Sequence, residues 1–148
     1  MKALIAALAF VTLAAPIATS AALAEGKQHK LVLQISDNDP QKMNTVLNVA
    51  ANVSRLYSER GDEVDVKVVA FNAGLHMLRT DTSPVAKRME SFAASMPNVS
   101  FEACDNTRTA MAKQSGKDVP LFEFANVVPA GVVSIMELNE KGYTVIRP

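Results

Sequence analysis

Short apolar runs alternate with amphipathic stretches along the chain. Residues 30–36 and 64–71 are largely apolar and rich in β-branched side chains, which is typical of strands buried in a parallel sheet. Between them lies a predicted helix, with Asp39 as its capping residue and Pro40 at its first position. Gly61 is expected to end this helix. Its apolar face consists of Met43, Val46, Leu47, Ala50, Val53 and Tyr57.

The same alternation continues to the C-terminus. A loop at 72–78 is followed by a helix that begins at Ser83-Pro84, and residues 99–104 alternate as a third strand. Asp105, Asn106 and Thr107 then lead into a further helix. The remaining expected elements are that helix at 108–114, an irregular apolar segment at 119–124, a short strand at 127–129, a helix at 131–140 and a strand at 143–146.

Strands that alternate with helices at this spacing define the expected fold class. They predict an α/β fold, a three-layer α/β/α arrangement with a mostly parallel sheet of about five strands and helices on both faces. Residues 25–148 have the length of one domain, and they contain no repeat and no internal linker.

Residues 1–24 have the three parts of a secretory signal peptide. Lys2 supplies the positive charge, residues 3–15 form the apolar run, and Ala22-Leu23-Ala24 is a typical cleavage site. The run is too short to span a bilayer, which needs about 20 residues. No Arg-Arg pair precedes it, so we expect export to the periplasm by the general secretory route. An uncleaved anchor and a buried core helix are the alternatives.

The charge balance is neutral, with 15 basic and 15 acidic residues. Neither nucleic acid nor an anionic membrane surface is therefore expected as a partner. No second long apolar segment follows the signal, so no membrane span is expected in the mature chain. Cys104 is the only cysteine, which rules out an intramolecular disulfide and leaves an unpaired thiol in an oxidising compartment.

Cys104 stands at the end of the third predicted strand. Ligand sites of open parallel sheets lie beyond the carboxyl ends of the strands, and a helix N-terminus after Cys104 favours a thiolate. Asn106 and Thr107 are candidate hydrogen-bond donors to that thiolate. The adjacent Asp105 acts against it, because a like charge raises the pKa of a thiol. The alternative is that Cys104 is a buried residue that packs as a small hydrophobe.

The loop after the second strand places Asn72 and His76 at the same edge of the sheet. His76 is a candidate proton acceptor for the thiol, and its alternative is an ordinary surface histidine. Asp37 and Asp39 fit turn and capping chemistry, so no metal site is expected. No Gly-rich phosphate-binding motif and no G-x-S-x-G motif occurs. Neither a nucleotide cofactor nor any other cofactor is therefore expected, and an α/β-hydrolase is disfavoured.

Several segments together resemble the DsrE/DsrF-like family over essentially the whole of residues 25–148. The resemblance is carried by the opening strand and by residues 71–75, 99–107, 127–132 and 141–148. It implies a compact α/β domain that assembles as an oligomer, often a trimer or hexamer. It also implies sulfur transfer through a cysteine at the end of the third strand, a position that Cys104 matches. The best-understood members are cytoplasmic, whereas this chain is expected to be exported.

Two functions follow as expectations. The first is a periplasmic sulfur-handling protein in which Cys104 carries sulfane sulfur as a persulfide. Asn72, His76, Asn106 and Thr107 would then line its site, and a sulfur donor or acceptor protein would be its partner. The second is a non-catalytic, homo-oligomeric module that binds a small ligand and uses Cys104 only for packing. An intermolecular disulfide through Cys104 is a further possibility. Whether the protein is an enzyme stays open.

Overall fold

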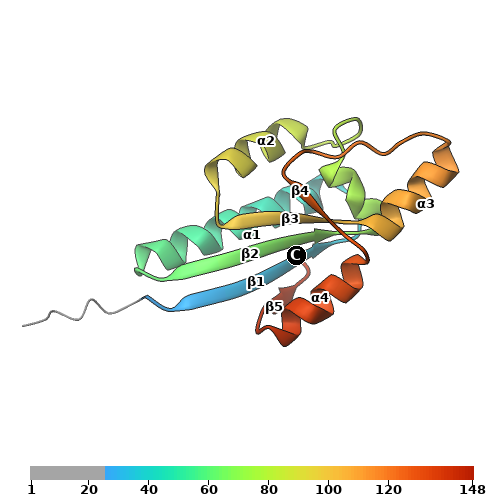
Figure 1. Ribbon diagram of the computed structural model, residues 1–148. Coiled ribbons are helices and arrows are strands. Elements are labelled where there is room, and N and C mark those ends of the chain that lie inside the picture. Colours follow the sequence, from blue (N-terminus) through green and yellow to red (C-terminus); the bar gives the residue numbers. More distant parts are fainter. Residues whose placement is uncertain (1–25) are drawn as a thin grey trace, which may run out of the picture.

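The computed structural model describes residues 26–148. Five strands form one sheet in the order β4-β3-β2-β1-β5, and every neighbouring pair is parallel (Figure 1). This confirms the predicted α/β/α fold class. The elements are β1 (Gln28–Ile35), α1 (Pro40–Glu59), β2 (Glu63–Ala70), the 3-10 helix η1 (Asn72–Leu78), α2 (Ala86–Ser95), β3 (Val99–Cys104), α3 (Asp105–Ser115), β4 (Ala125–Val128), α4 (Gly131–Glu140) and β5 (Thr144–Ile146).

The helix α1 begins where the sequence predicts it. Asp39 Oδ1 accepts hydrogen bonds from the backbone N–H groups of Gln41 at 2.7 Å and Lys42 at 3.4 Å, and Pro40 occupies the first helical position. These contacts satisfy N–H groups that have no partner within the helix. After α1 the chain turns at Gly61, whose φ of 76° lies in the left-handed region that glycine tolerates best.

The connections between strands explain the order of the sheet. From β1 the chain moves outward through β2 and β3 to the edge strand β4, with the intervening helices packed on one face of the sheet. It then returns through α4 to place β5 beyond β1, at the opposite edge. A right-handed crossover in this reverse direction requires α4 to lie on the other face. Figure 1 shows α2 and α4 on opposite sides of the strands.

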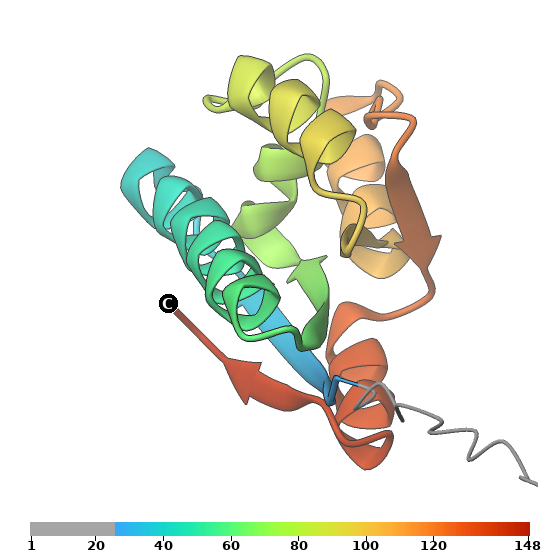
Figure 2. The same cartoon turned by 90° about the vertical axis from the view of Figure 1, so that its left-hand side faces the viewer.

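The two faces of the sheet are covered unequally. A large apolar cluster forms under α1, α2, η1 and α3, with Leu33, Leu47 and Phe101 among its fully buried side chains. The other face is packed mainly by α4, seen below the strands in Figure 2. Its cluster is small and consists of Val32, Val69, Ile135, Leu138 and Tyr143, with Phe71 packed against it.

Several predicted boundaries shift, and α2 begins at Ala86 and not at Ser83-Pro84. The helix α3 already begins at Asp105, directly after Cys104, and β4 begins at Ala125. Residues 72–78 are not a loop but the 3-10 helix η1, part of which is buried against the end of β1. Gly74 makes this possible, because a Cβ there would lie 2.2 Å from the backbone oxygen of Ile35. The predicted signal peptide at 1–24 lies outside the described residues.

Within residues 26–148, the structure has no helix that is both long and apolar enough to cross a bilayer.

Candidate functional site

The carboxyl ends of β3 and β4 form the point where neighbouring connections leave for opposite faces of the sheet. Cys104 ends β3 and is paired with Val128, which ends β4. The helix α3 starts at once on the face of the large cluster, since Met111 and Ala112 pack against it. The helix α4 leaves toward the other face. Such a switch point is where open α/β sheets place their ligand sites.

Cys104 directly precedes α3, and a Cβ at Gly131, the first residue of α4, would lie 3.3 Å from the Cβ of Cys104. Figure 1 shows the starts of α3 and α4 near the ends of β3 and β4. It is 5% exposed. Burial acts to raise the pKa of its thiol, but hydrogen bonds to the charged form outweigh burial and the pKa is lowered. They come from the Thr107 hydroxyl and then from the backbone N–H groups of Gly131, Thr107 and Asn106. The donors therefore belong to both α3 and α4, and together they favour the thiolate.

The donors differ in how freely they reach the sulfur. The N–H group of Asn106 already donates to the backbone oxygen of Pro129 at 3.2 Å. The neutral thiol makes no capping hydrogen bond at the start of α3, and α4 likewise has no side-chain cap. These helix N-termini thus keep N–H groups available for a negative charge.

Gly131 brings α4 close to the sulfur. It occupies the first position of α4 and is buried. A Cβ at Gly131 would lie 3.1 Å from the Cβ of Phe71 and 3.3 Å from the Cβ of Cys104. Both distances are tighter than most Cβ contacts, so a side chain here would require its neighbours to shift by a few tenths of an ångström. The sequence predicts a helix at 131–140 but assigns its first residue, Gly131, no role.

The Thr107 hydroxyl is held from its other side. The backbone N–H of Asn72 donates to Thr107 Oγ1 at 3.0 Å, which links η1 to α3 across the end of the sheet. Asn72 has a φ of 48° and is the single non-glycine residue with positive φ in the described part of the chain. The candidates Asn72, Asn106 and Thr107 are therefore brought together with Cys104, Asn72 by way of Thr107.

The structure places His76 elsewhere. Its Nδ1 lies 2.8 Å from Thr82 Oγ1, and His76 is not among the groups that shift the pKa of Cys104. Partial burial and then the positive charge of Arg79 lower the pKa of His76. The direction of a side chain within a 3-10 helix was not readable from the sequence, which predicted a loop here.

Asp105 does not determine the direction in which the pKa of the Cys104 thiol is shifted. Its carboxylate lies 3.8 Å from the guanidinium of Arg108 and is 47% exposed, so its charge is partly compensated and screened by water. On the same face of the sheet as Cys104, Glu102 accepts a short hydrogen bond from the hydroxyl of Ser134. Neither carboxylate is among the causes that set the pKa of Cys104.

A shallow depression of about 350 Å³ is lined by residues of η1 and α3, and Cys104 is not among them. Thr107, three residues after Cys104, belongs to its wall. The lining is mainly amide and small polar groups, and the residues are Asn72, Asn106, Thr107, Ala110, Met111 and Gln114. The cavity can admit a small polar molecule next to the Thr107 hydroxyl.

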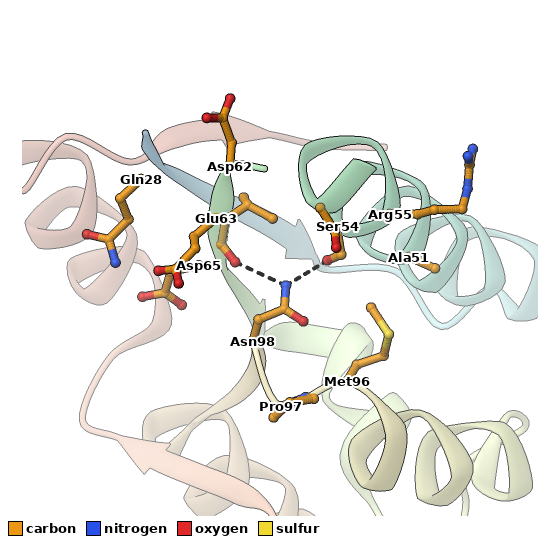
Figure 3. Close-up of a pocket in the computed structure, with 12 residues that line it drawn as sticks. Gln28, Ala51, Ser54, Arg55, Asp62, Glu63, Asp65, Met96, Pro97 and Asn98 are labelled. Atoms are coloured by element: carbon orange, nitrogen blue, oxygen red, sulfur yellow. Dashed lines mark hydrogen bonds between the residues drawn. The ribbon is translucent and has the colours of Figure 1, made fainter. Parts of the chain in front are cut away.

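A larger cavity of about 740 Å³ lies at the opposite, amino-terminal end of the strands (Figure 3). Asn98 spans its wall and donates to Ser54 Oγ at 2.7 Å and to the backbone oxygen of Val64 at 3.0 Å. Two of its three acidic residues have hydrogen-bond partners, because Asp62 accepts from the Lys27 N–H and Asp65 accepts from the Tyr143 hydroxyl. No cysteine, histidine or lysine lines this cavity. The larger cavity and the cysteine therefore lie at different ends of the sheet.

Metal binding finds no support in residues 26–148, where no group of three or more His, Cys, Asp or Glu side chains is arranged to hold an ion.

Fold and site together define an α/β/α domain with a buried cysteine at the switch point of its sheet. The chain belongs to the family of MTH1491, a protein of unknown function from Methanobacterium thermoautotrophicum. The two chains are 31% identical, the match covers 81% of this chain and 99% of that one, and the TM-score is 0.64. No protein-family model and no curated protein matches the chain.

Proposed function

We propose that this protein handles sulfur in the periplasm and that Cys104 carries sulfane sulfur as a persulfide. The observation that carries the proposal is the position of Cys104 where two helices begin: α3 starts at the next residue, and a Cβ at Gly131 of α4 would lie 3.3 Å from the Cβ of Cys104. Thiolate is the nucleophilic form of cysteine. A buried cysteine that served only for packing would have its pKa raised by burial, with nothing to reverse the shift.

The proposed step needs no external oxidant. The Cys104 thiolate attacks a sulfane sulfur of a small donor such as polysulfide or thiosulfate, and a new S–S bond forms. The S–S bond in the donor breaks, and its electron pair leaves with the remaining fragment, which is sulfite when the donor is thiosulfate. The persulfide anion inherits the hydrogen-bond donors that favour the thiolate. The depression beside Thr107 has room for a donor of this size.

The location and assembly of the protein belong to the same proposal. Export rests on the signal-like residues 1–24, and the sulfur-carrier role rests also on the resemblance to the DsrE/DsrF-like family. We propose a homo-oligomer in which a second copy covers the exposed apolar residues of α4, namely Val132, Val133 and Met136. Met136→Glu is then expected to lower the solution mass measured by light scattering, while wild-type protein that is already monomeric would exclude this assembly.

Intact mass spectrometry tests the carrier function directly. The mature protein is exposed to polysulfide or thiosulfate under non-reducing conditions, with Cys104→Ser as the matched control. We expect the wild-type chain to gain the mass of one or more sulfur atoms and the variant to gain none. A wild-type chain that takes up no sulfur and resists alkylation at neutral pH contradicts the proposal.

A second candidate function is favoured by a different observation. The cavity of about 740 Å³ falls within the usual range for small-molecule sites, about 300–1,000 Å³, and it lies away from Cys104. In this alternative the protein is a non-catalytic binding module and the thiol only packs. Cys104→Ser would then leave ligand binding intact, and wild-type Cys104 would react slowly with alkylating reagents until the protein unfolds.

A further inference from the structure

The edge strand β5 extends the sheet beyond the helix α1. Among the helices, α1 packs against β1 and β2, whereas α4 packs against β5 from the other face. In the sheet register, Leu31 pairs with Thr144 and Leu33 pairs with Ile146. Paired residues of neighbouring strands point to the same face, and Leu31 and Leu33 belong to the large cluster under α1. Thr144 and Ile146 therefore point to the α1 face, at the edge of the sheet beside that helix.

A groove of about 440 Å³ lies between α1 and this edge of the sheet. Leu56 of α1 and Ile146 of β5 both line it, and they are 42% and 43% exposed. The partly buried side chain of Val53 and the buried side chain of Leu31 add to its apolar lining. Large exposed apolar side chains gathered at one concave surface are a mark of a binding site, and the volume lies in the usual range of about 300–1,000 Å³.

The groove and the cavity of about 740 Å³ lie on different sides of α1. Leu56 and Arg60 line the groove, whereas Arg55 and Ser58 line the larger cavity. With 3.6 residues per helical turn, these two pairs point in different directions from the helix axis. The two linings have a pair of residues in common at the starts of β1 and β2, Gln28 and Val64.

The charged groups that line the groove are all basic. Neither aspartate nor glutamate occurs among its lining residues. Lys30 Nζ already donates to a backbone oxygen at 3.2 Å. His29 Nε2 lies 3.4 Å from Asp62 Oδ2, and the His29 ring stacks on Tyr57 with 3.8 Å between the ring centroids. Arg60 is exposed and makes neither an ion pair nor a side-chain hydrogen bond within residues 26–148. Its guanidinium is therefore available to an anion.

We propose that this groove binds an aliphatic monocarboxylate, with the tail against Leu56 and Ile146 and the carboxylate at the Arg60 guanidinium. A guanidinium can donate two parallel hydrogen bonds to a carboxylate. Its single charge balances a monoanion, whereas a phosphate monoester carries about two charges. The last carbonyl oxygens of α1 would repel an anion, but they already accept hydrogen bonds from the N–H groups of Arg60, Gly61 and Asp62.

Three probes with the same eight-carbon tail test the chemistry of the groove. Octanoate, octan-1-ol and octylamine are each titrated into the mature protein by calorimetry, below the concentrations at which they aggregate. We expect octanoate to bind at one saturable site, octan-1-ol to bind about tenfold more weakly and octylamine to show no binding. Octylamine that binds as tightly as octanoate would overturn the proposal, and so would octanoate that does not bind.

NMR places the bound octanoate. The largest changes in amide shift are expected at Leu56, Arg60, Thr144 and Ile146, on the two sides of the groove. Shift changes confined to the larger cavity, around Ser54 and Asn98, would contradict the proposal, because they would assign the ligand to the other side of α1.

Arg60→Gln tests the carboxylate contact. It should weaken octanoate binding about tenfold, because a charge-assisted hydrogen bond is lost, and it should leave octan-1-ol binding unchanged. Arg55→Gln is the matched control, since Arg55 is an exposed arginine of the same helix that pairs with Glu59 at 2.7 Å and lines the larger cavity. Equal affinities of the Arg60→Gln variant and wild type for octanoate would contradict the contact.

Two adjacent residues of β5 test the apolar contact. Ile146→Glu places a carboxylate in the groove and should abolish octanoate binding. Val145 is also exposed, at 36%, but successive residues of a strand point to opposite faces. Val145→Glu should therefore bind octanoate as wild type does, and circular dichroism checks that both variants are folded. Folded variants that bind octanoate equally well would overturn the proposal.

A second copy of the chain is the other occupant that the experiments distinguish. Leu56→Glu should abolish octanoate binding and leave the solution mass measured by light scattering unchanged. A lower mass for this variant, together with wild-type protein that does not bind octanoate, would assign the groove to contact between copies and overturn the proposal.

The inference does not rest on the proposed sulfur chemistry. Cys104 does not line the groove, so Cys104→Ser should bind octanoate with the wild-type affinity. Failure of sulfur uptake and failure of octanoate binding are therefore separate outcomes. Octanoate binding that is lost in Cys104→Ser would contradict the position assigned to the ligand.

Discussion

The two ends of the sheet differ in what they offer a ligand. The amino-terminal end has the larger cavity, about 740 Å³, and two of its acidic residues, Asp62 and Asp65, already have hydrogen-bond partners. The carboxyl-terminal end has a depression of only about 350 Å³. It also has a thiol whose pKa is lowered against the effect of burial, beside a backbone conformation with positive φ. By cavity volume alone, the amino-terminal end would be the candidate site. The shifted pKa of Cys104 instead indicates the carboxyl-terminal end.

The largest expected effect follows from substitution at Cys104. Cys104→Ser should abolish both sulfur uptake and alkylation, because it removes the only thiol of the chain. A ligand bound in the amino-terminal cavity should bind this variant as it binds wild type. Intact mass and calorimetric titration on the same preparations check the two parts. Loss of ligand binding in the variant would mean that the two ends do not act separately.

Gly131→Ala should disturb the carboxyl-terminal end in two ways. The added methyl group meets Phe71 and Cys104, so stability should fall by about 1–3 kcal/mol, as for other overpacked sites. Displacement of the N–H group of residue 131 should also raise the pH midpoint of Cys104 alkylation, because the thiolate loses a hydrogen-bond donor. Urea unfolding and the pH–rate profile measure the two effects.

Gly116→Ala is the matched control for that change. Gly116 has a φ of 67° and open space where a Cβ would lie, so its substitution should lower stability by about 1–2 kcal/mol through the backbone alone. The pH midpoint of Cys104 alkylation should stay at its wild-type value. A Gly131→Ala variant that behaved like this control would show that the α4 N-terminus does not act on the thiol.

Asn98→Ala probes the amino-terminal end. It removes hydrogen bonds to Ser54 and to the backbone oxygen of Val64, and stability should fall by about 1–3 kcal/mol. The alkylation midpoint of Cys104 should stay at its wild-type value, since the change lies at the far end of the strands. A shifted midpoint in a folded variant would reveal coupling between the ends.

The smallest effect is a pH dependence of stability. The pKa of Cys104 is lower in the folded protein than its ordinary value, which is about 8.5 in an unfolded chain. The stabilisation from the thiolate is therefore fully present above about pH 8.5 and is lost as the pH falls through the folded pKa. Urea unfolding at a series of pH values should show wild type gaining stability over Cys104→Ala as the pH rises. A difference that shrinks with rising pH would mean that burial controls the thiol.

Local signals in the sequence were sufficient for much of the fold. Asp39 and Pro40 marked the start of α1 because capping depends on adjacent residues, and the alternation up to Cys104 marked the end of β3. The role of Gly131 could not be derived in this way, because it depends on β4 lying beside β3 while α4 crosses to the other face. The direction of His76 depends on the packing of η1, which no local pattern encodes.

The unequal covering of the sheet has a consequence for hydrogen exchange. The layer under α4 rests on a small cluster that includes Val32, Val69 and Ile135, so it should open locally at a lower free energy than the layer under α1. Each such opening withdraws the Gly131 N–H group from Cys104 and exposes the sulfur. Amide exchange in α4 should therefore be faster than in α1. It should also slow down when Cys104 is ionised, because the thiolate holds the first turn of this helix in place.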